Sequence, residues 1–509
     1  MNPSAVAVSF AGVLEVVPRR ATPGTARGSR TGGTPAPRAG TETVSRPDRT
    51  EGLPEAPART ATTRRPEAPA EAARPTGVPA ATEAPAPAEA PARPTGNEAK
   101  RLFLRMVRPK PEPNPYPAYA RLREIGTVVP VVFPGVAPRY LVTSFAECAE
   151  MLRDDNIGPL TEAHFHETNP TWREQGLARS LFNSMAFHSG AEHRLDRAMF
   201  ARHFSPRRTA RRRESMVEIA ETLLDRLAEL GANGATVDIE HELGVPYSAL
   251  IIGRLMGIPD EQAMRLGWLA RQSGATLELA PSPAQRQQAA SLGEQLRKEL
   301  AELGALRRRE PQEDMITDLA VACGEDEERL TSSLVLLFSA GFDSPVSLIG
   351  LGLQLFLDNP DQARLLREDP ELADLATEEM LRCEPPVQIM FRAARSEVTL
   401  GGQTIPAGSI LLGLVASALR DSALVEDPER FDITRRPSSG LSFGGGAHYC
   451  LGAHLARLSA SVLFPRLLRR FPDIRPAGQP RYRAPGVALR GLESLPVTLT
   501  PPLTPSDPS

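Results

Sequence analysis

The spacing of apolar and polar positions predicts a mainly helical body after the first hundred residues. In residues 214–232, apolar side chains recur at intervals of three and four, as on one face of an amphipathic helix. Residues 329–358 form a longer, largely apolar stretch that also predicts a helix. Asp343 and Pro345 interrupt this stretch, so it lacks the ~20 continuous apolar residues of a membrane span. We expect it to be a buried core helix.

Shorter elements precede and follow these two helices. The pattern predicts a helix over residues 371–383 that stops at Pro385-Pro386. A short helix, a strand, a second helix and a group of short strands are predicted over residues 116–126, 138–144, 145–154 and 396–413. Strands and helices do not alternate in the βαβ order of a doubly wound nucleotide-binding sheet. We therefore expect a mainly α fold with small β-sheets.

Residues 1–100 differ in composition from the rest of the chain. They contain 16 of the 50 prolines and many Ala, Thr and Gly residues, and the phrase ARPTG occurs in them twice. Such a segment cannot bury enough apolar surface to offset the loss of chain entropy. We expect residues 1–100 to form a disordered Pro/Ala-rich tail, residues 101–500 to form the folded domain, and residues 501–509 to form a second tail.

Charge and cysteine content exclude several classes of protein. The net charge of −3 gives no general attraction to nucleic acid. The four cysteines lie far apart, which does not resemble a disulfide framework and fits a reducing compartment. The apolar stretch near the N-terminus is short, contains Glu15 and follows no basic segment, so it does not predict a signal peptide. We therefore expect a cytoplasmic protein that interacts with neither nucleic acid nor membrane.

The most informative stretch is FGGGAHYCLGAHLAR at residues 443–457, where one cysteine follows a glycine-rich bend and precedes a helix. A helix N-terminus and nearby backbone N–H groups favour a thiolate. Glycines allow a flat ring to approach the backbone. A haem requires a site of this kind, with one soft anionic ligand and no bulk against the ring. The alternatives are a buried structural cysteine, a phosphate-binding loop, which normally carries Lys and Ser/Thr, and zinc, which needs more ligands.

The run from Phe443 to Gly452 resembles the haem-binding signature of the cytochrome P450 family, F-G-x-G-x-H-x-C-x-G, at every fixed position. The resemblance implies that the fold is the cytochrome P450 fold, that the cofactor is haem b, and that Cys450 is the iron ligand. It also implies that Phe443 packs beside the sulfur, that His448 reaches a haem propionate, and that Gly452 belongs to the cofactor site. The similarity covers about residues 101–500.

Two further pairs of residues support the resemblance. Glu379 and Arg382, three apart on a helix, resemble the E-x-x-R pair that braces the haem-binding core of the family. His193 and Arg197, four apart, resemble the family's H-x-x-x-R helix, whose cations neutralise haem propionates. Without the resemblance, these pairs would be interpreted as a surface ion pair and a solvated basic helix. Arg392 matches the position of a third propionate-binding residue.

The long apolar helix contains SAGFDSPVSL at residues 339–348. Ala340 and Gly341 are small, so a flat ring and a diatomic ligand could approach the backbone there. Pro345 cannot donate to the Gly341 carbonyl, and we expect the helix to open or kink at that point. Asp343 and Ser344 would place an acid and an alcohol beside the kink, where they could relay protons to dioxygen.

The family pattern at this helix is A-G-x-[D/E]-T-[T/S], and the chain departs from it at two positions. Ser344 stands in place of the Thr, and Pro345 follows it. Serine keeps the hydroxyl but lacks the methyl group that restricts its rotamer. This departure puts the efficiency of coupled hydroxylation in question, although not haem binding. Upstream of the cysteine loop, Gly440 replaces a His that many bacterial members carry.

The resemblance implies a monooxygenase that uses dioxygen to hydroxylate or epoxidise a medium or large apolar organic substrate in natural-product biosynthesis. Electrons would come from a ferredoxin and its reductase. The alternatives are a haem-thiolate enzyme of atypical chemistry, such as oxidative coupling, peroxide-driven oxidation or rearrangement, and a non-enzymatic haem-binding protein. We expect the substrate pocket to draw on the 160–187 loop with its aromatic residues, the 265–285 region, Phe338 and residues 387–390.

Overall fold

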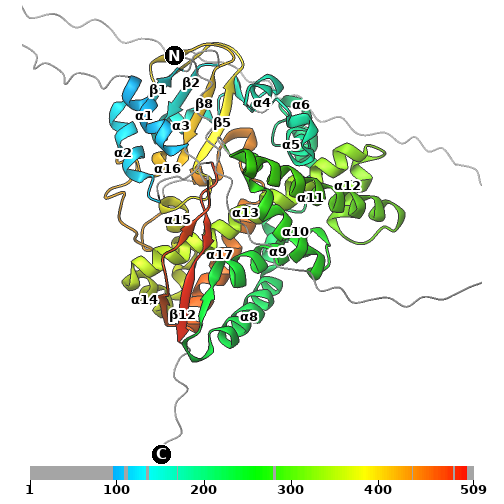
Figure 1. Ribbon diagram of the computed structural model, residues 1–509, viewed down its shortest axis with the longest axis vertical. Coiled ribbons are helices and arrows are strands. Elements are labelled where there is room, and N and C mark those ends of the chain that lie inside the picture. The colour runs from blue at the N-terminus through cyan, green and yellow to red at the C-terminus, as the bar shows by residue number, and fades with distance from the viewer. Residues whose placement is uncertain are drawn as a thin grey trace, which may run out of the picture. The chain divides into compact units, whose positions relative to one another are not determined.

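The long apolar stretch of the sequence folds as a single helix, α13 (Glu327–Asp358). The side chain of Asp326 accepts a hydrogen bond from the backbone N–H of Arg329 and caps its first turn. By length and composition, α13 could cross a membrane, but 72% of its most apolar window is buried inside the protein. In Figure 1 the other helices surround α13, as expected for the core helix of a globular domain.

A computed structural model describes residues 96–107, 113–132, 137–168, 170–278, 282–437, 440–484 and 488–500. All of them lie in one structural unit, Pro87–Ser509. The helices before α13 are α1 (Gly96–Met106), α2 (Tyr116–Ile125), α3 (Phe145–Met151), α4 (Glu162–Thr168), α5 (Gly176–Phe182), α6 (Gly190–Ala201), α7 (Pro206–Ala210), α8 (Arg213–Leu230), α9 (Val245–Met256), α10 (Asp260–Ser273), α11 (Pro283–Arg309) and α12 (Met315–Cys323). The helices after it are α14 (Pro360–Glu368), α15 (Ala373–Cys383), α16 (Val415–Ala418) and α17 (Ala453–Arg470).

The strands are short and form four small sheets. They are β1 (Val128–Val131), β2 (Arg139–Val142), β3 (Ile157–Gly158), β4 (Thr236–Asp238), β5 (Ile389–Ala394), β6 (Val398–Leu400), β7 (Gln403–Ile405), β8 (Ile410–Leu414), β9 (Asp473–Pro476), β10 (Arg481–Tyr482), β11 (Leu492–Ser494) and β12 (Pro496–Thr500). The largest sheet has the order β1-β2-β8-β5-β3, with β2 and β8 parallel and the other pairs antiparallel. Helices α1 and α2 pack against it, as Figure 1 shows.

Most elements predicted from the pattern of apolar positions are confirmed. The amphipathic stretch at 214–232 is α8, and the apolar stretch at 329–358 is α13. The helix predicted over 371–383 is α15, which ends at Cys383 before the two prolines. The expected mainly α fold with small sheets is confirmed. It could be predicted because the periods of apolar residues are long and regular.

Two expectations meet a different outcome. Helix α1 begins at Gly96, so the end of the segment expected to be disordered is helical; residues 1–95 and 501–509 lie outside the described residues. The long helix α13 also does not break at Pro345.

Helix α13 continues through Pro345 without interruption, which corrects the expected opening. A proline in a helix removes one hydrogen bond, to the carbonyl of Gly341, four residues earlier. Phe342 and Val346, on either side of that position, are fully buried and hold both halves of the helix in the core. Packing therefore outweighs the loss of one bond, and the Gly341 carbonyl lacks its usual donor at position i+4.

Candidate functional site

The loop before Cys450 depends on glycines at two positions. Gly444 and Gly446 have φ values of +79° and +61°, in the left-handed region that favours glycine. A Cβ atom at Gly446 would also collide with the carbonyl oxygen of Leu152. The backbone N–H of Cys450 donates to the carbonyl of Phe443 at 2.9 Å and closes the loop. Helix α17 begins directly after it, so the loop holds the cysteine just before a helix N-terminus.

The Cys450 side chain is exposed, and the surface that it exposes lines a cavity. Burial within the protein raises the pKa of the Cys450 thiol, whereas a hydrogen bond from the backbone N–H of Gly452 and the cations Arg197 and Arg457 oppose that rise. A thiol in this position becomes a thiolate when a metal ion binds it, since coordination displaces the proton. Among the described residues, no group of three or more His, Cys, Asp or Glu side chains is placed to hold a metal ion.

The cavity has a volume of about 400 Å³, and we call it the Cys450 cavity. The middle of α13 lines it, and so does the cysteine loop with the start of α17. The other lining residues come from α6 and the segments on both sides of it, α9, the end of α15, and β5 with the residues before it. The structure brings together at this cavity all but one of the residues predicted for the site: His193, Arg197, Ala340, Gly341, Ser344, Arg392, Phe443, His448, Cys450 and Gly452.

Four basic side chains meet at one part of this cavity. The rings of His193 and His448 lie 4.1 Å apart between centroids, and Arg197 donates to the carbonyl of Tyr449 at 2.8 Å. Burial, together with the neighbouring cations His193, Arg392 and Arg197, lowers the pKa of His448 to about 3. Burial also lowers the pKa of Arg392 to about 10. A negatively charged ligand beside these four basic side chains would therefore stabilise their charged forms.

No described acidic side chain forms an ion pair with Arg197 or Arg392. The Nε2 atom of His193 is buried and has no hydrogen-bond partner among the described residues. A buried cation without a counter-ion is costly, so the arrangement fits a ligand that carries carboxylates. Haem b has two propionates and one axial position for a thiolate. Cys450 can supply the thiolate, and the basic side chains on the same cavity can pair with the propionates. The site therefore fits haem b.

Asp343 is the predicted site residue that does not line the cavity. Its carboxylate pairs with Arg483 at 2.6 Å and lies 3.5 Å from Arg271, which also binds Glu240 at 2.8 Å. Successive residues of a helix point about 100° apart, so Asp343 and Ser344 face different surroundings. No sequence pattern indicates this pairing, because Arg271, Arg483 and Glu240 are distant from Asp343 along the chain.

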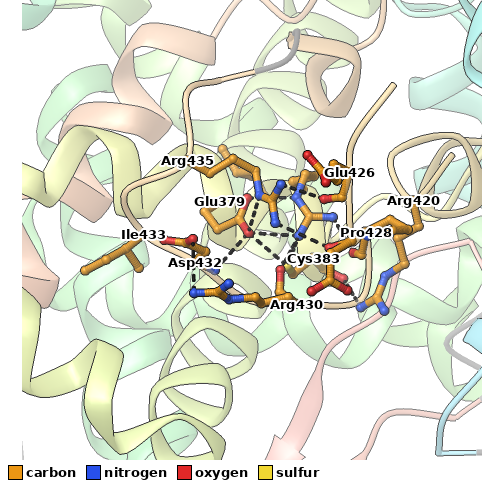
Figure 2. Close-up of polar contacts among 12 residues, drawn as sticks. Glu379, Cys383, Arg420, Glu426, Pro428, Arg430, Asp432, Ile433 and Arg435 are labelled. Carbon is orange, nitrogen blue, oxygen red and sulfur yellow. Dashed lines mark hydrogen bonds and ion pairs between the residues drawn. The ribbon is translucent and has the colours of Figure 1, made fainter. Parts of the chain in front are cut away.

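Glu379 and Arg382 form a doubly hydrogen-bonded pair, with N–O distances of 2.7 and 2.8 Å. Both side chains are buried, with exposed fractions of 3% and 4%. Arg382 also donates to the carbonyls of Pro428 and Arg430, at 2.7 and 2.8 Å. Figure 2 shows that the segment 428–435, which we call the strap, wraps around this pair.

The strap in turn contributes its own donors to Glu379. The backbone N–H of Asp432 donates to Oε1 at 3.0 Å, and Arg435 lies 3.4 Å from the same atom (Figure 2). On the other side of the pair, Arg420 donates to the carbonyl of Cys383 at 2.7 Å. The pair therefore ties α15 to the chain that leads into the cysteine loop, which agrees with its expected bracing role.

The wall that we expected to receive the substrate is only partly present at the cavity. Met185, Val387 and Met390 line it. The aromatic residues of the 160–187 loop pack against each other instead, with ring centroids 4.6–5.9 Å apart: Phe165, Trp172, Phe182 and Phe187. Phe338 stacks on Phe342. Aromatic self-association, which no sequence pattern reports, has removed these rings from the cavity.

Helix α9 contributes residues to the cavity that sequence reasoning missed: Tyr247, Ser248, Ile251 and Ile252. The spacing of these residues is that of an ordinary buried helix face, so nothing in the sequence distinguishes them from core positions. Sequence reasoning also missed Arg457, because nothing in the local sequence distinguishes it from the other arginines of α17. Its guanidinium lies 4.3 Å from the ring centroid of Phe443, beside the cysteine loop.

Comparison with known proteins places the chain among haem enzymes. The family model described as Cytochrome P450 matches residues 326–481. The "Biotin biosynthesis cytochrome P450" of Bacillus subtilis is 32% identical over 389 residues, which cover 76% of this chain and 96% of that protein. The "6-deoxyerythronolide B hydroxylase" of Saccharopolyspora erythraea is 34% identical over 404 residues, which cover 75% and 96%.

Solved structures agree with the sequence relatives. A crystal structure of P450BioI in complex with an acyl carrier protein ligated to hexadec-9Z-enoic acid has a TM-score of 0.70 and 32% sequence identity to this chain. The match covers 76% of this chain and 99% of that one. The fold therefore has a counterpart in a solved structure of known class.

Proposed function

The chain belongs to the cytochrome P450 family, and on that premise we propose that it is a haem-thiolate monooxygenase of natural-product biosynthesis. The observation that carries the proposal is the Cys450 cavity, whose lining combines a thiol, partly buried cations and the small residues Ala340 and Gly341 of α13. When bound, haem b supplies reductive activation of dioxygen, in which one oxygen atom enters the substrate and the other leaves as water.

The protein's own residues have three tasks in this chemistry. Cys450 provides the sulfur ligand, while His193, Arg197, Arg392 and His448 would hold the two propionates. The apolar cavity wall keeps solvent away from the reacting atoms. Hydroxylation of a C–H bond also consumes two electrons and two protons for each dioxygen, so donors of both must reach the site.

The chemistry of the lining supports an apolar substrate of medium or large size. Beyond the residues assigned to the cofactor, the cavity is lined mainly by aliphatic and sulfur-containing side chains, among them Met185, Ile251, Leu336, Val387 and Met390. The hydroxylase relative is named for 6-deoxyerythronolide B, and the solved neighbour carries a hexadecenoic acid on its partner. Such walls favour hydrocarbon surface and leave orientation to a few polar groups.

We assign the last proton-transfer step to Ser344, the member of the predicted acid–alcohol pair that lines the cavity. Asp343 can take part only when it releases Arg483. Ser344→Ala should therefore retain haem and substrate binding but divert more of the consumed NADPH to hydrogen peroxide. Ser344→Thr should couple as well as the parent or better. Equal coupling in Ser344→Ala and the parent would exclude Ser344 as the relay and favour the atypical chemistries.

An exposed arginine group supports an acidic electron donor such as a ferredoxin. Arg207, Arg208, Arg211 and Arg213 are exposed, and none of them forms an ion pair with a described residue. Burial and the cation of Arg208 lower the pKa of Arg212, which shows the density of positive charge in this segment. Helix α7 packs against α17, the helix that follows the cysteine loop. The basic surface therefore lies on the thiolate side of the cavity.

Reversing two of these charges, as Arg208→Glu with Arg211→Glu, should slow reduction of the haem by a ferredoxin roughly tenfold at low salt, since electrostatic steering is lost. Stopped-flow reduction rates measured across a salt series test this. Haem content should not change. The matched control is Arg469→Glu with Arg481→Glu, two exposed arginines elsewhere. The same slowing in both double variants would contradict a specific docking surface.

The proposed reaction is tested by NADPH consumption in the presence of a ferredoxin and its reductase. Compounds that shift the Soret band of the ferric protein should also accelerate NADPH oxidation and yield an oxygenated product. If peroxide alone drives product formation, the enzyme is a peroxygenase. If haem binds but no compound accelerates NADPH oxidation, the protein is a haem-binding protein without monooxygenase activity.

We place the reaction in the cytoplasm, where reducing conditions and soluble electron donors are available. All four cysteines are free, and Cys148, Cys323 and Cys383 are buried away from any disulfide partner among the described residues. The haem domain, in this proposal, extends from α1 to β12.

A further inference from the structure

Ser248 on α9 is a buried hydroxyl that the proposed reaction does not yet use. Its side chain is 1% exposed and lines the Cys450 cavity. Its Oγ atom has no hydrogen-bond partner within the part of the chain that the structure describes. A buried hydroxyl without a partner is rare, and a polar ligand or an ordered water normally explains it.

The packing of α9 on α13 fixes which residues Ser248 faces. Gly244, Ser248 and Ile252 are spaced by four and so form one stripe along α9. At one end of the stripe, a Cβ atom on Gly244 would lie 3.5 Å from Val346; at the other end, a Cβ atom on Gly341 would lie 2.5 Å from Ile252. Ser248 is midway between these two contacts. It therefore faces α13 near the turn that contains Ser344 and Pro345.

That turn has a second polar group that lacks its usual partner. Pro345 has no backbone N–H, so the carbonyl of Gly341 lacks the i+4 donor that a helix normally supplies, although the helix remains unbroken. Residues i and i+4 share a helix face, and Gly341 and Pro345 both line the cavity, as does Ser344. Two hydroxyls and one carbonyl without its usual helical donor therefore belong to residues that line the same cavity.

We propose that Ser248 and the Gly341 carbonyl hold an ordered water molecule beside Ser344, and that this water passes protons to the Ser344 hydroxyl. A buried water needs two to four polar partners, and this wall offers three. The water donates to the carbonyl and to one hydroxyl and accepts from the other. Each proton that it gives to Ser344 is replaced from solvent, so neither the water nor the hydroxyl is consumed.

This inference rests on the proposed monooxygenase function and specifies how Ser344 obtains its protons. It also gives a reason for the two departures at the oxygen-activation helix. Serine loses the methyl group that restricts a threonine rotamer, and a water held on two other groups restores a fixed partner for its hydroxyl. In this account Ser248 is a positioning residue, because it acts through the water and touches no reacting atom.

The first test is a crystal structure of the haem-loaded protein at a resolution that shows ordered solvent. We expect a water within hydrogen-bond distance of both Ser248 Oγ and the Gly341 oxygen, and we expect it to be lost in Ser248→Ala. A wild-type structure in which Ser248 Oγ contacts the haem or another protein group, with no water at this wall, would overturn the proposal.

The second test compares Ser248→Ala with Ser332→Ala. Ser332 is an equally buried serine hydroxyl without a partner among the described residues, but it lies earlier on α13 and does not line the cavity. Ser248→Ala should lower product formed per NADPH by roughly two- to tenfold, less than the ~100-fold cost of losing a general acid. It should also change the solvent deuterium isotope effect on product formation, while Ser332→Ala should change neither quantity.

The outcomes separate this inference from the function on which it rests. If the parent enzyme forms product but Ser248→Ala has the same coupling and isotope effect, the water is not part of the proton route. If the parent itself oxygenates no compound, the monooxygenase function fails, whereas the crystallographic test of the water remains decisive. If both serine variants lose coupling equally, the effect is one of packing and the proposal is wrong.

Discussion

Replacing Cys450 with alanine is expected to abolish the red-shifted Soret band of the CO-bound ferrous protein, together with all substrate oxidation. Cys450 lines the same cavity as the middle of α13, and no other cysteine lines it. Alanine cannot ligate iron, and the electron donation of the thiolate that favours O–O cleavage is lost with it. The basic side chains around the propionates remain, so some haem should still bind.

The spectrum of the CO-bound ferrous protein measures this effect directly. Cys323→Ala is the matched control, because Cys323 is a buried free thiol on α12 outside the cavity. That variant should keep both the band and the activity. A red-shifted band that survives in Cys450→Ala would show that another residue is the ligand, and the assignment of the loop at 443–452 would then be wrong.

The second large effect is expected from Glu379→Gln. The variant removes the negative charge that Arg382 binds at 2.7 and 2.8 Å, in a place where both side chains are buried. Leaving one member of a buried ion pair uncompensated costs about 3–5 kcal/mol. Glutamine keeps only one acceptor oxygen, so the donors Asp432 and Arg435 of the strap at 428–435 would have to share it with Arg382. We expect lower stability and a marked loss of bound haem.

Urea unfolding and the ratio of haem to protein absorbance report the two consequences separately. Glu368→Gln is the control, since Glu368 forms an exposed pair with Arg364 on α14, and such surface pairs contribute at most ~1 kcal/mol. If Glu379→Gln does not fold, Glu379→Asp, which keeps the charge on a shorter side chain, should fold with intermediate stability. Parent-like unfolding and haem content in Glu379→Gln would refute the bracing role.

Local sequence signals predicted the parts of the site that one short segment builds. The glycines before Cys450 and the pairs at i+3 and i+4, such as Glu379 with Arg382, act over one turn or one helix, so their spacing alone indicates the geometry. The same holds for α8 and α13, whose apolar periods are long. These features were predicted because the physics that shapes them operates between near neighbours in the chain.

Features that depend on tertiary contacts could not be predicted in this way. Asp343 and Ser344 are adjacent in sequence, yet the partner of Asp343 is Arg483, which only the folded chain brings to it. The uninterrupted helix at Pro345 reflects packing on both sides of that residue. Ser248 looks like any polar residue on a helix until the register of α9 on α13 shows what it faces.

Turnover under isotopically labelled dioxygen tests most directly whether the chain is a monooxygenase. The haem-loaded protein, a ferredoxin, its reductase and NADPH would be combined with a compound that shifts the ferric Soret band. Mass spectrometry would then measure how much labelled oxygen the product contains. We predict one labelled oxygen atom in each product molecule and the other in water. A product that carries oxygen only from unlabelled water, or NADPH consumption that ends entirely in peroxide, would contradict this account.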